Sequence, residues 1–432
     1  MRADIITIGD EILIGDTVNT NASWMGQFLS ERGVRIHRVI TISDQFHTIQ
    51  EALADSARQA ELTIMTGGLG PTHDDITKKA IVDWLGVGTV RHQPTLEHIR
   101  KIFAKRNFTM SQANYEQADV PENAEVLFNK AGTAPGMWID RDGHHLAILP
   151  GVPHEMKYLI EHLVWPKIRE LQQLQHPPRI QYLRTASVPE STLSELVIGD
   201  LSGWINDHLE VAYLPGSDGV TIRVTAYPME GESRESTQKR LKGLVDHIHT
   251  KAFEHIFAFE RSVSMAAHLG ELLRDKGLSV VAAESCTGGL LTSTLTDIPG
   301  SSDYALGGWV AYSNAMKTAE LGVPEAMIAE HGAVSKPVAL QMARAAAEQS
   351  GADIGISTTG IAGPGGGTDE KPVGTVWIGY YSGHTHFALR AVLTNNRQIN
   401  KERSVHVALD TIRRTISDYS SLPYGLAPHF PS

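Results

Sequence analysis

The chain has 432 residues, of which 41% are hydrophobic and 20% charged, and its formal net charge is -11. This length excludes one ordinary domain, and the acidic balance argues against a non-specific nucleic-acid or anionic-membrane surface, because both would repel the protein. The single cysteine, Cys286, excludes an internal disulfide and the usual Cys clusters for zinc or iron–sulfur, which favours a reducing compartment.

The first residues, MRADIITIGDEILIG, lack the basic segment, long apolar core and cleavage site of a signal peptide. No run of the chain approaches the about 20 apolar residues that a membrane-spanning helix needs. We therefore expect a cytoplasmic protein with no membrane segment.

The N-terminal part alternates predicted strands with predicted helices. This alternation is typical of a parallel, doubly wound α/β sheet, which binds ligands beyond the carboxyl ends of its strands. The predicted elements are a strand at 3–8, a helix opened by Asn19-Thr20-Asn21, a strand at 34–42, a helix at 49–60 and a strand at 62–65.

The strand at 62–65 runs into the loop TGGLGPTHDD, residues 66–75. Glycines let the backbone approach an anion closely, so Gly67, Gly68 and Gly70 predict a cradle for a phosphate-bearing ligand. Asp74 and Asp75 are candidates to hold a divalent cation against that phosphate. The alternative is that Thr72 and Asp75 form a capping box at the start of the next helix.

The composition turns polar and proline-bearing near residues 172–178, which predicts a linker. Residues 181–259 then read as strand, helix, two strands and helix, with a turn at PGSDG. No nucleophile, metal cluster or basic stripe stands out here. We expect a small α+β domain with a structural or dimer-forming role, and domain boundaries of 1–172, 173–259 and 260–420.

Residues 278–290, LSVVAAESCTGGL, predict a buried strand, a tight turn and a helix. Ser285 falls on that turn, where unpaired N–H groups of the helix start can stabilise an oxyanion. This placement suits a nucleophile. The alternative is that Ser285 only caps the helix.

A further strand at 307–313 ends beside Asn314, which we expect to cap a helix with Lys317 in its first turn. The positive end of a helix disfavours an ammonium, so Lys317 is a candidate base for Ser285, with Tyr312 beside it. The alternative is a surface lysine packed along a strand.

The strand at 353–359 empties into GIAGPGGG, residues 360–367, a second candidate phosphate cradle. The last helix opens after Asn395-Asn396, and Arg397 at its start can fork onto a phosphate. Flexible loops have similar compositions, so the glycines alone are weak evidence.

These motifs together resemble the competence/damage-inducible protein A (CinA) family over essentially the whole chain. The segments IGDEIL, NTNA, TGGLGPTHDD, APGM and LPGVPHEM are similar to its molybdopterin-binding-like N-terminal domain. The segments AESCTGG, VAYSNAMK, HGAVS, TGIAGPGGG and KPVGTVW are similar to its C-terminal nicotinamide-nucleotide amidase domain.

The resemblance implies that the C-terminal domain hydrolyses the carboxamide of nicotinamide mononucleotide, without a cofactor, to nicotinate mononucleotide and ammonia. Ser285 would be the nucleophile, and Lys317 and Tyr312 would activate it and shuttle protons. The nucleotide would be held by Thr287, Gly288, Thr359, Gly360, Gly363 and Arg397. The usual Gly-Asp before that arginine is Asn395-Asn396 here, which weakens the assignment of Arg397.

For the N-terminal domain the resemblance implies cleavage of ADP-ribose to AMP and ribose 5-phosphate, dependent on a divalent metal ion and K⁺. Asp74, Asp75 and Glu11 would bind the metal, and Asn21, Gly67, Gly68 and Gly70 the substrate. Both reactions would recycle fragments of NAD. The family also implies a homodimer.

Three alternatives remain open at this stage. Cys286 is a rival nucleophile, because a thiolate at a helix start is more reactive than an alcohol. The N-terminal domain can instead be a pterin-binding module of molybdenum-cofactor assembly. The protein can also be a non-catalytic partner of the recombination or DNA-uptake machinery, which its charge permits through a protein partner but not through direct DNA binding.

Overall fold

The computed structural model describes residues 1–70, 76–105, 107–172, 177–216 and 218–431. They form two compact units, Met1–Pro178 and Arg179–Ser432, each described by itself below. The predicted division into three domains stays a prediction.

The N-terminal unit is built on one six-stranded sheet of order β2-β1-β3-β8-β7-β6. The strands β1, β2, β3 and β8 run parallel, while at one edge β7 is antiparallel to β8 and β6 is antiparallel to β7. The central strands β1 and β3 are almost entirely buried and mostly apolar, because both of their faces are covered. The bounds are β1 (Arg2–Ile8), β2 (Arg35–Ile42), β3 (Leu62–Thr66), β6 (Glu125–Leu127), β7 (Gly136–Arg141) and β8 (His144–Leu149).

Alternate residues of β1 face opposite layers of helices. Ile5 packs in a core with Met25 of α2 (Thr20–Ser30) and Met156 of α7 (Pro153–Leu159), which continues through a π-helical segment (Ile160–Val164) into α8 (Trp165–Gln172). Ile6 packs on the other side with Ile49 of α3 (Phe46–Gln59) and Ile81 of α4 (Thr77–Leu85). These two layers confirm the predicted doubly wound sheet.

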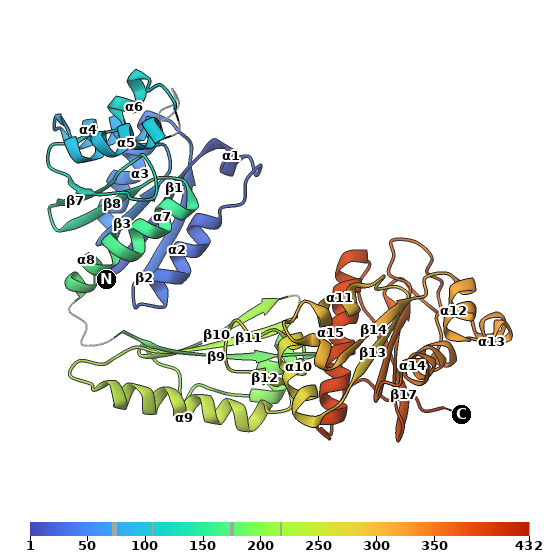
Figure 1. Cartoon of the computed structure of the whole chain (residues 1–432). Helices are drawn as coiled ribbons and strands as arrows, with labels where there is room; N and C mark the ends of the chain where they lie inside the picture. The colour runs from blue at the N-terminus through green and yellow to red at the C-terminus, as the bar shows by residue number, and fades with distance from the viewer. Residues whose placement is uncertain (71–75, 106, 173–176, 217, 432) are drawn as a thin grey trace. The chain divides into compact units, whose positions relative to one another are not determined.

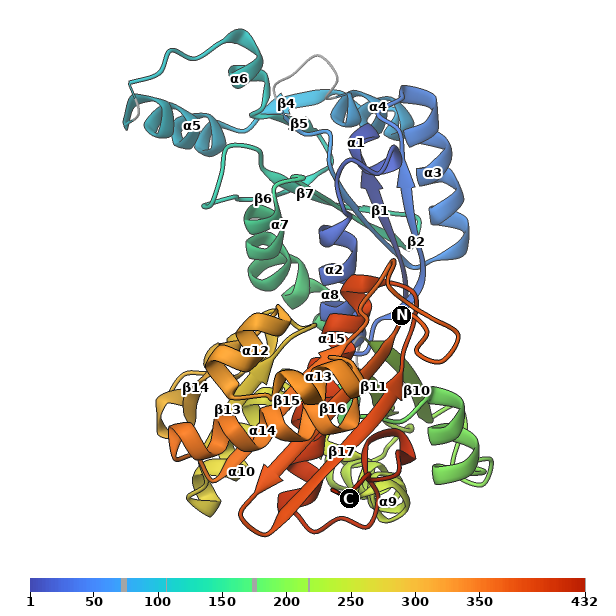
Figure 2. The same cartoon turned by 90° about the vertical axis from the view of Figure 1, so that its right-hand side faces the viewer.

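The remaining elements of this unit gather at one end of it (Figure 2). They are the two-stranded ribbon of β4 (Thr89–Arg91) and β5 (Asp119–Pro121), with α5 (Gln93–Lys105) and α6 (Gln112–Glu116). The short helix α1 (Asp10–Leu13) directly follows β1.

The second unit begins with a four-stranded antiparallel sheet of order β10-β11-β9-β12. The long helix α9 (Arg234–Ala252) buries Leu244 and Ile248 in one core with Ile222 and Val224 of β11. This is the predicted small α+β region. The other bounds are β9 (Arg179–Thr185), a π-helical segment (Thr192–Ile198), β10 (Leu209–Gly216), β11 (Gly219–Ala226) and β12 (Ile256–Ala258).

The C-terminal part of this unit contains a five-stranded sheet of order β14-β13-β15-β16-β17. The strands β14, β13 and β15 are parallel, and β16 and β17 are antiparallel to their neighbours. The carboxyl ends of β13 and β15 therefore lie together at one sheet edge. The bounds are β13 (Val280–Glu284), β14 (Ala305–Val310), β15 (Ile354–Gly360), β16 (Thr375–Ser382) and β17 (Thr385–Val392).

Helices cover both faces of this sheet (Figure 1). Val280 and Ala282 pack under α10 (Met265–Lys276), α11 (Leu290–Thr296) and α15 (Arg397–Ile416). Val281 and Ala283 point to the opposite face, beneath α12 (Asn314–Leu321), α13 (Glu325–His331) and α14 (Lys336–Ser350). Short 3₁₀ turns occupy Ser301–Asp303 and Pro423–Gly425.

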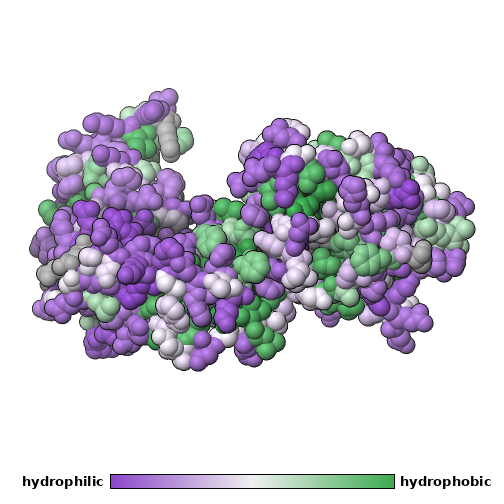
Figure 3. Space-filling view, turned by 90° about the horizontal axis from the view of Figure 1, so that it is seen from below, coloured by the Kyte–Doolittle hydropathy of each residue, from purple (hydrophilic) through white to green (hydrophobic). Residues whose placement is uncertain are grey.

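The face shown in Figure 3 is mostly hydrophilic, with apolar side chains in small groups. Within the part of the chain that the structure describes, no helix combines the length and apolar character needed to cross a bilayer.

Candidate active site

Ser285 stands on the turn between β13 and α11. Its backbone N–H donates to the carbonyl of Thr358 on β15 at 2.9 Å, which continues the parallel ladder one residue beyond the strand. The chain then reverses through Gly288 and Gly289, whose φ angles of 62° and 95° favour glycine. The Ser285 side chain is only 8% exposed. The turn thus holds the hydroxyl in one place at the sheet edge.

Glu284, which the sequence analysis did not single out, fixes this turn. Its fully buried carboxylate accepts the backbone N–H groups of Gly289 (2.9 Å), Leu291 (3.0 Å) and Thr292 (2.8 Å), and the hydroxyl of Thr292 (2.7 Å). It therefore satisfies the free N–H groups at the start of α11 and places a negative charge at the positive end of that helix.

Lys317 reaches Ser285 from α12. Its Nζ lies 3.0 Å from Ser285 Oγ and donates to the carbonyls of Ala311 (3.0 Å) and Tyr312 (3.2 Å). The side chain is 1% exposed, so it is not the surface lysine of the alternative reading. The helix is capped by Ser313, whose side chain accepts from Met316 N at 3.1 Å, and not by Asn314 as we expected; Asn314 is the first helical residue.

Burial has opposite consequences for the two ionisable groups beside Ser285. It lowers the pKa of Lys317, because the ammonium loses its hydration. It raises the pKa of the Cys286 thiol to about 12, because a thiolate is disfavoured there. Cys286 packs within the hydrophobic core with residues such as Leu291 and Ile356. The surroundings thus favour a neutral amine and disfavour a thiolate.

The turn also carries an unused donor. Among the described residues, the backbone N–H of Thr287 has no acceptor, while the Thr287 hydroxyl pairs with that of Thr358 at 2.7 Å. Thr287 is fully buried, so its side chain supports the turn from inside.

Tyr312 and Arg397 contact each other, and the proton shuttling expected of Tyr312 stays a prediction. The Tyr312 hydroxyl accepts from Arg397 Nη2 at 2.9 Å, and its ring is 58% exposed. Arg397 Nη1 donates to the carbonyl of Gly363 at 2.9 Å. It is the Tyr312 carbonyl, not its hydroxyl, that contacts Lys317. Tyr312, Gly363 and Arg397 therefore connect the segment between β14 and α12, the second glycine loop and α15.

Close contacts hold the end of β15 and the start of the second glycine loop in place. The Thr359 hydroxyl donates to the carbonyl of Ala333 at 2.8 Å, and Gly360 has room for no Cβ beside Val376. Asn400, also missed from the sequence, is fully buried and donates to the carbonyls of Ala362 (3.0 Å) and Thr394 (2.8 Å). Nothing in its local sequence signals these contacts, which depend on the packing of α15.

The predicted N-terminal residues lie at the carboxyl edge of the other sheet. Asn21 Nδ2 donates to the carbonyl of Gly151 at 2.7 Å, and Asn21 Oδ1 is buried with no partner among the described residues. A Cβ on the same Gly151 would lie 3.4 Å from Gly67 Cα, and a Cβ on Gly67 would lie 2.2 Å from the carbonyl oxygen of Ile8. Gly68 is equally tight against Thr77.

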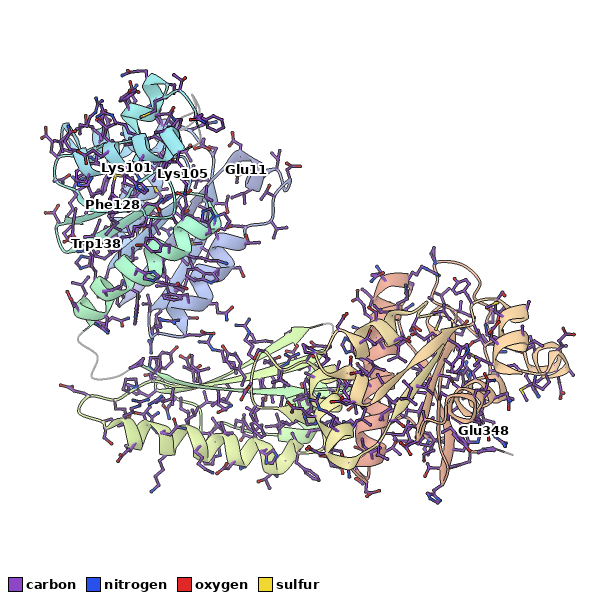
Figure 4. All side chains as sticks on the ribbon, viewed as in Figure 1. Glu11, Lys101, Lys105, Phe128, Trp138 and Glu348 are labelled. Carbon is purple, nitrogen blue, oxygen red and sulfur yellow. The ribbon has the colours of Figure 1, made fainter. Side chains whose placement is uncertain are left out.

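The metal site predicted for this unit lies mostly outside the described residues, because Asp74 and Asp75 belong to 71–75. Glu11 is exposed on α1 (Figure 4). Gly70 lines a cavity of about 430 Å³ together with Lys78, Arg91, Gln117 and seven neighbours. Within the described part of the chain, no three His, Cys, Asp or Glu side chains are placed to hold a metal ion.

Three family models match the chain. The model described as "Probable molybdopterin binding domain" matches residues 4–170, "Damage-inducible protein CinA KH domain" matches 181–258, and "CinA C-terminal domain" matches 262–416. Together they follow the order of the three sheets.

Relatives match over almost their full length. A CinA-like protein from Chloroherpeton thalassium is 43% identical over 425 residues, which cover 96% of this chain and 100% of the relative. A CinA-like protein from Salinibacter ruber is 42% identical over 419 residues, which cover 96% of this chain and 100% of the relative. A crystal structure of the protein CinA from Thermoplasma acidophilum is 32% identical, covers 38% of this chain and 96% of its own, and has a TM-score of 0.36.

Proposed function

The chain belongs to the CinA family, and we propose that its C-terminal part hydrolyses the carboxamide of nicotinamide mononucleotide to nicotinate mononucleotide and ammonia. One observation carries the proposal, the 3.0 Å contact between Lys317 Nζ and Ser285 Oγ in a buried position. A Ser-Lys pair of this kind is an attested arrangement for acyl transfer.

The first half of the reaction forms an acyl-enzyme. Neutral Lys317 takes the proton of Ser285, and Oγ attacks the carboxamide carbon. This attack gives a tetrahedral intermediate with a negatively charged oxygen. The Lys317 ammonium then gives its proton to the amide nitrogen, the C–N bond breaks, and ammonia leaves.

The second half releases the acid. Lys317, neutral again, takes a proton from water, and the hydroxide attacks the ester carbon. The bond to Ser285 Oγ breaks, Oγ recovers its proton from Lys317, and the nicotinate carboxylate departs. Carbonyls of Ala311 and Tyr312 keep the amine pointed at Oγ throughout, so Tyr312 acts here by orienting the base.

The direct test is ammonia release from nicotinamide mononucleotide by the purified full-length protein, with Ser285→Ala beside it. We expect release from the wild type that disappears in the variant. A folded wild type that releases no ammonia would overturn the proposal and shift attention to the N-terminal unit or to a binding role.

We also propose that the N-terminal unit cleaves ADP-ribose to AMP and ribose 5-phosphate, with a divalent metal ion and K⁺. The support is the close glycine packing at the sheet edge and the cavity beside Gly70. Of the three candidate metal ligands only Glu11 is described, so we assign no step to the metal. AMP formation that EDTA abolishes would support this activity, and pterin binding without turnover would instead favour the cofactor-assembly role.

A cytoplasmic homodimer acting on these small nucleotides completes the proposal. The single cysteine supports the reducing compartment, and homodimers are the commonest assemblies. Sedimentation of the full chain would test the dimer.

A further inference from the structure

Lys401 lies beside the turn that carries Ser285. Its Nζ is 3.8 Å from the point that a Cβ on Gly288 would occupy. The Gly288 N–H donates to the Ser285 carbonyl at 3.1 Å, so this glycine belongs to the same tight turn. Lys401 follows Arg397 by four residues on α15, which puts both cations on one face of the helix.

This ammonium has no partner among the residues that the structure describes. No carboxylate lies within 4.0 Å of it, and it makes no hydrogen bond to a protein acceptor there, although its side chain is half-buried. By contrast, Lys336 and Lys371 each donate to a backbone carbonyl. A half-buried ammonium with three free donors favours an anionic ligand.

The other positive groups of the site are already engaged. Glu284 takes three N–H groups at the start of α11. Arg397 donates to the Gly363 carbonyl and the Tyr312 hydroxyl, so its fork serves the loops around it. Lys401 is therefore the cation at this turn that is left for a ligand.

We propose that Lys401 binds the phosphate of the substrate and thereby selects a phosphorylated nicotinamide compound over the free nucleoside. The inference rests on the proposed amidase function and extends it to a specificity residue. An ammonium facing a phosphate adds a charge-assisted contact that the nucleoside lacks.

The test compares two substrates with the same carboxamide and ribose, nicotinamide mononucleotide and nicotinamide riboside. In Lys401→Met we expect kcat/KM for the mononucleotide to fall about 50-fold, mainly through a higher KM, because one charged hydrogen bond is lost. The value for the riboside should change less than about threefold. Lys401→Arg should recover most of the loss, because it restores the cation.

Lys239→Met is the matched control, since Lys239 is an exposed lysine of α9 with no contact to the turn. It should leave both substrates unchanged. An equal loss on the two substrates in Lys401→Met, or no loss on either, would overturn the phosphate role while leaving the amidase proposal intact.

A binding measurement separates the two proposals. Calorimetric titration of Ser285→Ala with nicotinamide mononucleotide should show weaker binding when Lys401→Met is added, and the riboside should bind both variants alike. If the wild type releases no ammonia but this difference holds, the amidase proposal fails and the phosphate site stands.

Discussion

Ser285 and Cys286 are neighbours in the chain but lie in different surroundings. The serine hydroxyl faces Lys317, whereas the thiol packs in the apolar core with a pKa raised to about 12. We predict that Ser285→Ala lowers ammonia release by at least about 1,000-fold, because no other hydroxyl can take its place. Cys286→Ala should keep most of the activity, within about tenfold, after a modest packing loss.

The readout is the initial rate of ammonia release from nicotinamide mononucleotide, with circular dichroism as the check on folding. Activity that survives in Ser285→Ala and disappears in Cys286→Ala would assign the nucleophile to the thiol.

The burial of Lys317 predicts how kcat and the free energy of unfolding change with pH. Burial lowers its pKa below the ordinary value of 10.5, and the reaction needs the neutral amine. The rate kcat should therefore rise with pH and level off above this lowered pKa. The unfolded chain binds a proton that the folded chain lacks between the two pKa values, so the free energy of unfolding should also rise with pH in that window.

A pH profile of kcat measures the effect on the rate. The effect on stability is measured by comparing the free energy of unfolding of the wild type and Lys317→Met over the same pH range. In the variant, the part of the rise that comes from Lys317 should be absent. A kcat that is constant with pH up to the ordinary lysine range would show that Lys317 is not the base.

Residue types and spacing predicted which side chains lie together here, but not all of their contacts. Ser285 and Lys317 were both predicted because each follows a strand, and parallel strands bring their carboxyl ends to one edge. The use of the Tyr312 carbonyl in place of its hydroxyl, and the engagement of Arg397 by Gly363, depend on side-chain directions that spacing does not determine.

At the scale of elements, the β13–α11 turn depends on a single buried charge. Glu284→Gln replaces one carboxylate oxygen with a donor that faces backbone N–H groups. We predict a loss of about 2 kcal/mol in the free energy of unfolding, since hydrogen bonds to a charged group are lost and a donor is left unmatched. Ammonia release should fall as well, because the turn also positions Ser285.

Thermal unfolding followed by circular dichroism would measure this loss. Glu271→Gln on the exposed face of α10 is the matched control, and an equal melting temperature for Glu284→Gln and the wild type would contradict the capping role.

Helices and strands were predictable from apolar periodicity, whereas their caps were less so. The local pattern placed a cap at Asn314, but the structure uses Ser313, since either side chain can accept the free N–H groups of the first turn. The capping role of Glu284 was not predicted, because this residue belongs to an apolar strand and caps a helix that begins six residues later.

At the scale of the molecule, α15 joins the two sheets of the second unit. Asp410 is fully buried and accepts from Arg413 Nε (2.7 Å) and Arg414 Nε (2.8 Å). Arg413 also donates to the Glu254 carbonyl and Arg414 contacts His255, both at the end of α9. The five-stranded sheet and the four-stranded antiparallel sheet are thus connected through buried charges.

This cluster predicts the pattern of unfolding. Asp410→Asn leaves two buried guanidinium groups without their anion, which typically costs about 3–5 kcal/mol. Calorimetry of the full chain should show one transition for Met1–Pro178 and one for Arg179–Ser432, and only the second should drop, by about 10 °C.

Asp297→Asn, at an exposed helix end, is the comparison and should leave both transitions in place. If Asp410→Asn instead splits the second transition in two, the two sheets do not unfold as one body.

Fold class was predictable at this scale, because strand–helix alternation and turn residues recur throughout the chain. The buried ionic contacts between the two sheets were not predictable, because the spacing of Asp410, Arg413 and Arg414 is also typical of ion pairs on a solvated helix face. Only the packing of α15 against the turn after α9 shows that this face is buried.

The buried cluster on α15 also constrains how this domain can be separated from its neighbour in evolution. A C-terminal part separated at the start of α10 would expose Arg413 and Arg414 and lose their contacts to Glu254 and His255. We therefore expect proteins that contain only this C-terminal part to have smaller or uncharged residues in place of the two arginines. The residue types at positions 413 and 414 would then distinguish C-terminal parts that are still joined to the antiparallel sheet from those that have been separated from it.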